Sequence, residues 1–102
     1  MYEAIRKTVL DAIQEAVEKK LINGTSGNIA FRDPEHPNIL AITPSGISYT
    51  GMKLEDIAIV EMQEDGTNKW IEGNYKPSSE VPMHTAVMRA RKDVNATVHT
   101  HS

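Results

Sequence analysis

The spacing of the apolar residues changes along this chain, and that change constrains its fold more than any other feature. Up to residue 21 they recur at steps of three and four, the repeat of one helix face. They then come in short runs separated by glycine, proline, asparagine and aspartate, which is typical of strands and turns. Helical spacing returns after residue 80, and a last apolar run follows. The predicted order is helix, two hairpins, helix and strand.

The first helix is expected over residues 2–21, with one apolar stripe that faces the core. Lys19 and Lys20 suit its C-terminal end, and Asn23-Gly24 is expected to stop it. The stripe consists of Ile5, Val9, Ala12, Ile13, Ala16, Val17 and Leu21.

Two hairpins are expected in the middle of the chain. Asp65-Gly66 is a strong signal for the turn of the second hairpin. A break is predicted at residues 43–46 and a short helical turn or bend at 54–56. The paired strands are expected within residues 25–32 and 39–42, and within 57–62 and 69–71.

The second helix is expected to begin after residues 76–80 and to end near Arg91. A serine can cap it, and Pro82 is tolerated in its first turn. The last strand is expected over residues 94–101. The predicted buried face of this helix consists of Met83, Ala86, Val87 and Ala90.

Composition excludes several classes of protein. At 102 residues the chain forms one small domain at most. It has no cysteine, so disulfides and thiolate metal sites are excluded. A net charge of -3 argues against nucleic-acid binding, and no apolar stretch is long enough to span a membrane. A leader peptide would avoid the acidic residues at the start, so a cytoplasmic location is expected. The acidic residues near the start of the chain are Glu3, Asp11, Glu15 and Glu18.

Two histidines stand two residues apart in the last apolar run. On a strand, His99 and His101 point to the same face, where they can share one metal ion. A catalytic zinc needs three protein ligands and an open position. The alternative is a pair of polar residues on a solvated face.

The entrance to the second helix holds further candidates. Glu80 complements the positive end of a helix. Ser78 and Ser79 either cap the helix or, with its backbone amides, bind a phosphate. His84 follows Glu80 by four residues, where it either orients that carboxylate or is a satisfied structural histidine.

Two pairs of small residues stand at the ends of predicted strands. Gly27-Asn28 and Ser45-Gly46 would let the backbone approach an anion closely. Either pair alone is also consistent with a simple turn.

Taken together, five short motifs resemble the class II aldolase/adducin family, and most closely its L-fuculose-phosphate aldolase type. The resemblance implies a three-layer α/β/α fold around a largely antiparallel sheet. Since family members are longer, residues 1–102 would be the N-terminal part of a single class II aldolase-like domain, incomplete here. It also implies a homotetramer with active sites at subunit boundaries. The motifs are residues 27–29, 42–46, 55–57, 76–80 and 98–101.

The resemblance also assigns roles. His99 and His101 would be two of three histidine ligands to one Zn²⁺, with the third expected outside this chain. Glu80 would be the catalytic acid/base, and a metal ligand while substrate is absent. The residues that match the phosphate-binding group are Gly27, Asn28, Ser45, Gly46, Ser78 and Ser79.

The implied activity is zinc-dependent, reversible retro-aldol cleavage of a ketose 1-phosphate, such as L-fuculose 1-phosphate. The products are dihydroxyacetone phosphate and an aldehyde, and the 102-residue chain alone is expected to be inactive. One alternative is an L-ribulose-5-phosphate 4-epimerase-like enzyme. Epimerases tend to have aspartate at the position of Glu80, but the run His-Thr-His-Ser is common among them. Dehydratase and decarboxylase relatives share the motifs, and a non-catalytic adducin-like module would need no metal ligands.

Overall fold

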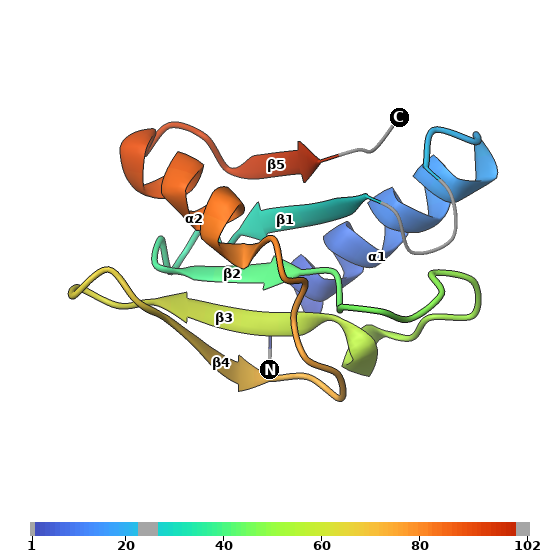
Figure 1. Cartoon of the computed structure of the whole chain (residues 1–102), viewed down its shortest axis with the longest axis horizontal. Helices are drawn as coiled ribbons and strands as arrows, with labels where there is room; N and C mark the ends of the chain where they lie inside the picture. The colour runs from blue at the N-terminus through green and yellow to red at the C-terminus, as the bar shows by residue number, and fades with distance from the viewer. Residues whose placement is uncertain (1, 23–26, 100–102) are drawn as a thin grey trace.

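A computed structural model describes residues 2–22 and 27–99. Two helices and a five-stranded sheet follow one another along the chain in the predicted order (Figure 1). Within the described part, no helix is long and apolar enough to cross a membrane. The elements are α1 (Glu3–Glu18), β1 (Asn28–Arg32), β2 (Ile39–Ile42), a 3₁₀ turn (Leu54–Asp56), β3 (Ala58–Met62), β4 (Asn68–Glu72), α2 (Val81–Ala90) and β5 (Ala96–His99).

The strands form one sheet in the order β4-β3-β2-β1-β5, with every neighbouring pair antiparallel. Both predicted hairpins are confirmed, β1 with β2 and β3 with β4. The last strand, β5, lies beside β1, far from it in sequence. The two strands at the ends of the chain's β region therefore become neighbours, which no local pattern indicates.

Each face of the sheet carries its own apolar layer. In β2, Ile39 and Ala41 pack with α1, whereas Leu40 and Ile42 pack with α2. Since successive side chains of a strand point to opposite faces, the two helices cover opposite faces of the sheet. This confirms the α/β fold and its three-layer arrangement.

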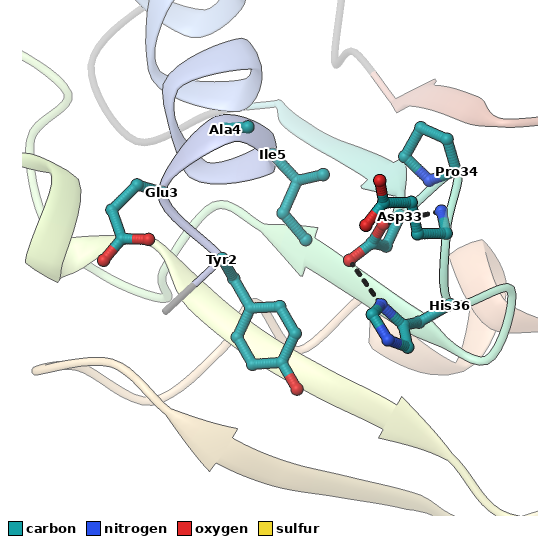
Figure 2. Close-up of a pocket in the computed structure, with 8 residues that line it drawn as sticks. Tyr2, Glu3, Ala4, Ile5, Asp33, Pro34 and His36 are labelled. Carbon is teal, nitrogen blue, oxygen red and sulfur yellow. Dashed lines mark hydrogen bonds and ion pairs between the residues drawn. The ribbon is translucent and has the colours of Figure 1, made fainter.

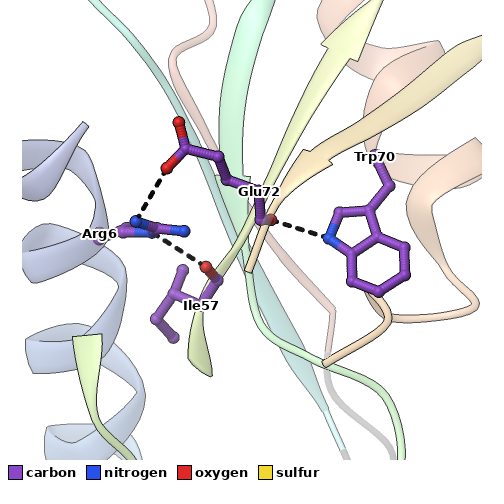
Figure 3. Close-up of polar contacts among 4 residues, drawn as sticks. All are labelled: Arg6, Ile57, Trp70 and Glu72. Carbon is purple, nitrogen blue, oxygen red and sulfur yellow. Dashed lines mark hydrogen bonds and ion pairs between the residues drawn. The ribbon is translucent and has the colours of Figure 1, made fainter. Parts of the chain in front are cut away.

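Helix α1 is docked by a buried arginine. Arg6 Nε donates to the carbonyl oxygen of Ile57 at 3.1 Å, and its Nη1 contacts Glu72 Oε1 at 3.3 Å (Figure 3). The indole of Trp70 donates to the backbone carbonyl of Glu72 at 2.8 Å. The start of α1 is thus tied to the ends of β3 and β4.

The end of α1 differs from the prediction. The helix stops at Glu18, and the amides of Lys20 and Leu21 donate back to Val17 and Ala16. This is a Schellman motif with Lys20 in the left-handed region, at a φ of 62°. The expected stop at Asn23-Gly24 lies outside the described residues, and the helix has already ended before it. Leu21 therefore leaves the apolar stripe and is 68% exposed, so its predicted core position is wrong.

Replacing Lys20 by glycine is expected to stabilise the protein by about 0.5–1 kcal/mol, because a side chain is disfavoured in the left-handed region. Urea unfolding measures the change. Lys20→Ala is the matched control, since it removes the same side chain but keeps the backbone penalty. Equal effects of glycine and alanine would contradict the prediction.

The predicted buried face of α2 is also wrong. Ala86, Val87 and Ala90 are exposed, and Met83 is only partly buried. The helix is rotated because two polar residues find partners beneath it. Thr85 Oγ1 donates to the carbonyl oxygen of Val81 at 2.9 Å and accepts from Asn68 Nδ2 at 3.1 Å, and the partners of His84 are described below. The residues buried on α2 are Val81, His84, Thr85 and Met88.

Candidate active site

The start of β1 lies beside the end of β5. Asn28 is the direct register partner of His99, so their side chains share one face of the sheet. Gly27 has a φ of 89°, and a Cβ there would lie 2.9 Å from Ile22 Cγ2 and 3.1 Å from the carbonyl oxygen of His99. Two residues predicted to bind phosphate thus adjoin a predicted metal ligand.

The loop after β2 runs beside the segment that leads into α2. The amide of Ser45 donates to the carbonyl oxygen of Lys76 at 2.8 Å. The amide of Ser78 donates to the carbonyl oxygen of Thr43 at 3.0 Å. The two predicted serine-containing pairs therefore lie on adjacent segments.

Ser78 forms a side-chain turn just before α2, whose N-cap residue is Glu80, and it does not cap the helix itself. Its Oγ accepts the amide hydrogen of Glu80 at 3.1 Å, and its carbonyl accepts the amide of Val81 at 3.2 Å. The hydroxyl hydrogen of Ser78 has no acceptor among residues 2–22 and 27–99, so it remains a donor for a ligand. Glu80, half-buried, stands immediately before the helix.

His84 connects α2 to the two neighbouring strands. It is fully buried, its Nε2 contacts Asn28 Oδ1, and its Nδ1 contacts Thr97 Oγ1. The sequence left two roles for His84, orienting the carboxylate of Glu80 or being a satisfied structural histidine, and the structure shows the second. Its ring nitrogens contact these neutral side chains and not the carboxylate of Glu80.

The charges around His84 act on its ring. Burial, and after it the neighbouring His99, lower the pKa of His84 to about 4, while the Glu80 carboxylate opposes the shift. His84 is therefore neutral near pH 7. The amide of His84 donates to the carbonyl oxygen of Glu80 at 3.2 Å, and His99 follows Thr97 by two residues on β5, so Glu80 and His99 both lie near His84.

The described residues supply only part of the predicted zinc site. His99, at the end of β5, and Glu80 offer an imidazole and a carboxylate, both of which zinc accepts. No three His, Cys, Asp or Glu side chains within the described ranges gather closely enough to hold a metal. His101 lies outside these ranges. The donors present fit zinc in kind, and the site stays a prediction.

Two hollows of the surface lie away from these residues. One, of about 550 Å³, is formed by the start of α1 and the turn after β1, with Tyr2, Asp33 and His36 in its wall (Figure 2). Another, of about 650 Å³, lies near the end of α2 and includes Arg32. Arg32 and Asp33 mark the far end of β1, roughly 15 Å along the strand from Asn28. Neither hollow contains a predicted site residue.

Sequence reasoning missed two residues of this region. Thr97 orients His84, and the buried hydroxyl of Tyr49 donates to the carbonyl oxygen of Gly27. Burial raises the pKa of Tyr49, with a hydrogen bond to Thr43 acting in the opposite direction, so the phenol keeps its proton. Alternation along β5 places Thr97 on the face of His99, but nothing local in the sequence indicates Tyr49.

Comparison with known proteins gives consistent similarities. The family profile described as the class II aldolase and adducin N-terminal domain matches residues 7–102. The 5-deoxy-D-ribulose 1-phosphate aldolase of Bacillus thuringiensis serovar kurstaki is 41% identical over 97 residues, which are 95% of this chain and 43% of that protein. The L-ribulose-5-phosphate 4-epimerase of Salmonella typhi is 35% identical over 100 residues, or 98% of this chain and 42% of that protein.

Solved structures agree with the fold. An L-fuculose 1-phosphate aldolase superposes with a TM-score of 0.84 at 33% identity, covering 97% of this chain and 44% of the other. A sugar-phosphate aldolase from Thermotoga maritima gives a TM-score of 0.80 at 25% identity, and the match covers 99% of this chain and 54% of the other. The chain thus spans less than half the length of the curated relatives above.

Proposed function

The chain belongs to the class II aldolase and adducin family. From that premise we propose that the whole protein is a zinc-dependent aldolase, with this chain as the N-terminal part of its single domain. Its substrate class would be ketose 1-phosphates, cleaved reversibly to dihydroxyacetone phosphate and an aldehyde. Relatives named as aldolases of deoxyribulose 1-phosphate and fuculose 1-phosphate support this substrate class. A homotetramer is part of the same proposal.

One observation carries the proposal. Asn28 and His99 are register partners on the face covered by α2, and His84 of that helix contacts Asn28 and donates its amide hydrogen to the carbonyl oxygen of Glu80 at 3.2 Å. A neutral amide, an imidazole and a carboxylate therefore come together from β1, β5 and the residue that precedes α2. This set can hold a phosphorylated substrate beside a general acid or base.

The proposed role of each residue follows from its chemical type. The amide of Asn28, the hydroxyls of Ser78 and Ser79, and the backbone at Ser45-Gly46 would donate hydrogen bonds to the phosphate. Neutral donors fix the substrate in place without a net positive field, in agreement with a net charge of -3. Glu80 would return a proton to carbon after cleavage and remove it in the reverse reaction.

Zinc, held by His99 and His101, would supply a Lewis acid for the substrate oxygens next to the bond that breaks. Glu80 would join these ligands when no substrate is present.

An epimerase is the second candidate, since a relative of that name is 35% identical to this chain. It would use the same bond cleavage, with rotation of the aldehyde before the bond re-forms. The two candidates differ in product, and Glu80 favours the aldolase because epimerases tend to have aspartate at that position.

An assay of the full-length protein with L-fuculose 1-phosphate, 5-deoxyribulose 1-phosphate and L-ribulose 5-phosphate tests the proposal. We expect dihydroxyacetone phosphate to be released from a ketose 1-phosphate, and no cleavage by the 102-residue chain alone. Interconversion of pentulose 5-phosphates without cleavage would establish the epimerase instead. Activity on none of the three would remove both candidates.

A further inference from the structure

A buried hydrogen-bonded triad joins three elements beneath the candidate site. It consists of Thr97 on β5, His84 on α2 and Asn28 on β1. His84 is fully buried, and Asn28 is 5% exposed. In sequence, His84 lies 56 positions from Asn28 and 13 positions from Thr97. The triad therefore forms only in the folded protein.

The hydrogen bonds of the triad are donated in one direction, from Thr97 to His84 and from His84 to Asn28. A neutral imidazole has one donor nitrogen and one acceptor nitrogen. Asn28 Oδ1 can only accept, so His84 Nε2 must carry the hydrogen, and His84 Nδ1 then accepts from the hydroxyl of Thr97. Complete burial between two neutral partners favours the uncharged ring.

That direction decides what Asn28 offers to a ligand. With Oδ1 engaged by His84, the other arm of the amide is Nδ2, which carries two N–H donors. Nδ2 has no hydrogen-bond partner in the described part of the chain, and it is not among the buried side-chain atoms left unpaired. It therefore keeps contact with solvent and is available to an anion.

We propose that His84 is a positioning residue that holds the Asn28 amide with its N–H donors, and not its oxygen, toward the substrate phosphate. The inference rests on the proposed function, because it assumes that a phosphate binds beside Asn28. In the reverse direction His84 Nδ1 would donate to Thr97, and the amide would turn its oxygen toward the anion. Thr97 and His84 together would thus set the preference of the site for an acceptor ligand.

The tautomer of His84 is the direct test. Nitrogen-15 NMR of the full-length, histidine-labelled protein separates protonated from unprotonated ring nitrogens, and loss of signals in His84→Gln assigns them. We expect a protonated Nε2 and an unprotonated Nδ1. The opposite tautomer would overturn the inference and leave the proposed function untouched. This measurement needs no ligand, and the tautomer itself is read from the unsubstituted protein.

Binding of inorganic phosphate to the full-length protein tests the consequence. Asn28→Asp keeps an oxygen for His84 but replaces the outward N–H donors by a carboxylate oxygen. We expect the dissociation constant for phosphate to rise by at least about tenfold. An unchanged constant, together with the expected tautomer, would contradict the phosphate assignment of the proposed function instead.

Two variants of His84 separate positioning from packing. Glutamine can still donate to Asn28 Oδ1, whereas leucine cannot, so His84→Leu should weaken phosphate binding and His84→Gln should restore most of it. Thermal unfolding is measured alongside, because both variants lose a buried aromatic ring. Phosphate binding that follows only stability, with no rescue by glutamine, would overturn the positioning role.

Discussion

Replacing Glu80 by glutamine in the full-length protein is expected to lower kcat by about 10³-fold, with little change in fold. Glutamine has the same shape but cannot carry a proton to and from carbon. The backbone amide of Glu80, which donates to Ser78 Oγ at 3.1 Å, is unaffected. Loss of the negative charge also removes an influence that raises the pKa of His84, so that ring stays neutral.

The assay for this prediction is the rate of dihydroxyacetone phosphate release at saturating substrate. Glu64→Gln is the matched control, since it makes the same chemical change on an exposed hairpin carboxylate far along the sheet. Metal content is measured for both variants, because Glu80 is also a predicted ligand in the substrate-free state. A Glu80→Gln enzyme within tenfold of the parent, with its metal retained, would show that Glu80 is not the acid/base.

Replacing Gly27 by alanine is expected to lower the free energy of unfolding by about 2–4 kcal/mol. Its φ of 89° costs an ordinary residue about 1–2 kcal/mol. In addition, the new Cβ would lie 2.9 Å from Ile22 Cγ2 and 3.1 Å from the carbonyl oxygen of His99. The backbone of β5 must then move away from β1, at the residue predicted to bind metal.

Urea unfolding of the Gly27→Ala and Gly66→Ala variants separates the two contributions. Gly66 has nearly the same φ, 92°, but nothing lies within 4 Å of the position its Cβ would take. We therefore expect Gly66→Ala to show the conformational cost alone. Equal losses at both positions would mean that the close approach of β1 and β5 contributes nothing to stability.

Much of the local structure was predictable because periodicity and turn chemistry act over a few residues. The Asp65-Gly66 turn and the two hairpins follow from neighbouring residues alone. One error was itself local, and the other arose where contacts with distant segments decided the outcome. Leu21 fits the helical stripe, but the Schellman motif at Lys20 removes it from the helix.

The candidate site could also be predicted only in part. Its residue types and their order along the chain indicated a phosphate-binding group, an acid and metal ligands. The prediction of the buried face of α2 was wrong because a buried, hydrogen-bonded histidine cannot be told from an exposed one by its neighbours in sequence. Only the partners Asn28 and Thr97, contributed by other elements, make burial of His84 favourable.

The amino-acid sequence by itself determined the elements, their order and the chemistry available, since these depend on local spacing and side-chain type. Tertiary structure alone decided that β5 pairs with β1, which brings Asn28 beside His99. It also decided the direction in which His84 holds the Asn28 amide. Both depend on contacts between distant segments, whose free energy no local pattern encodes.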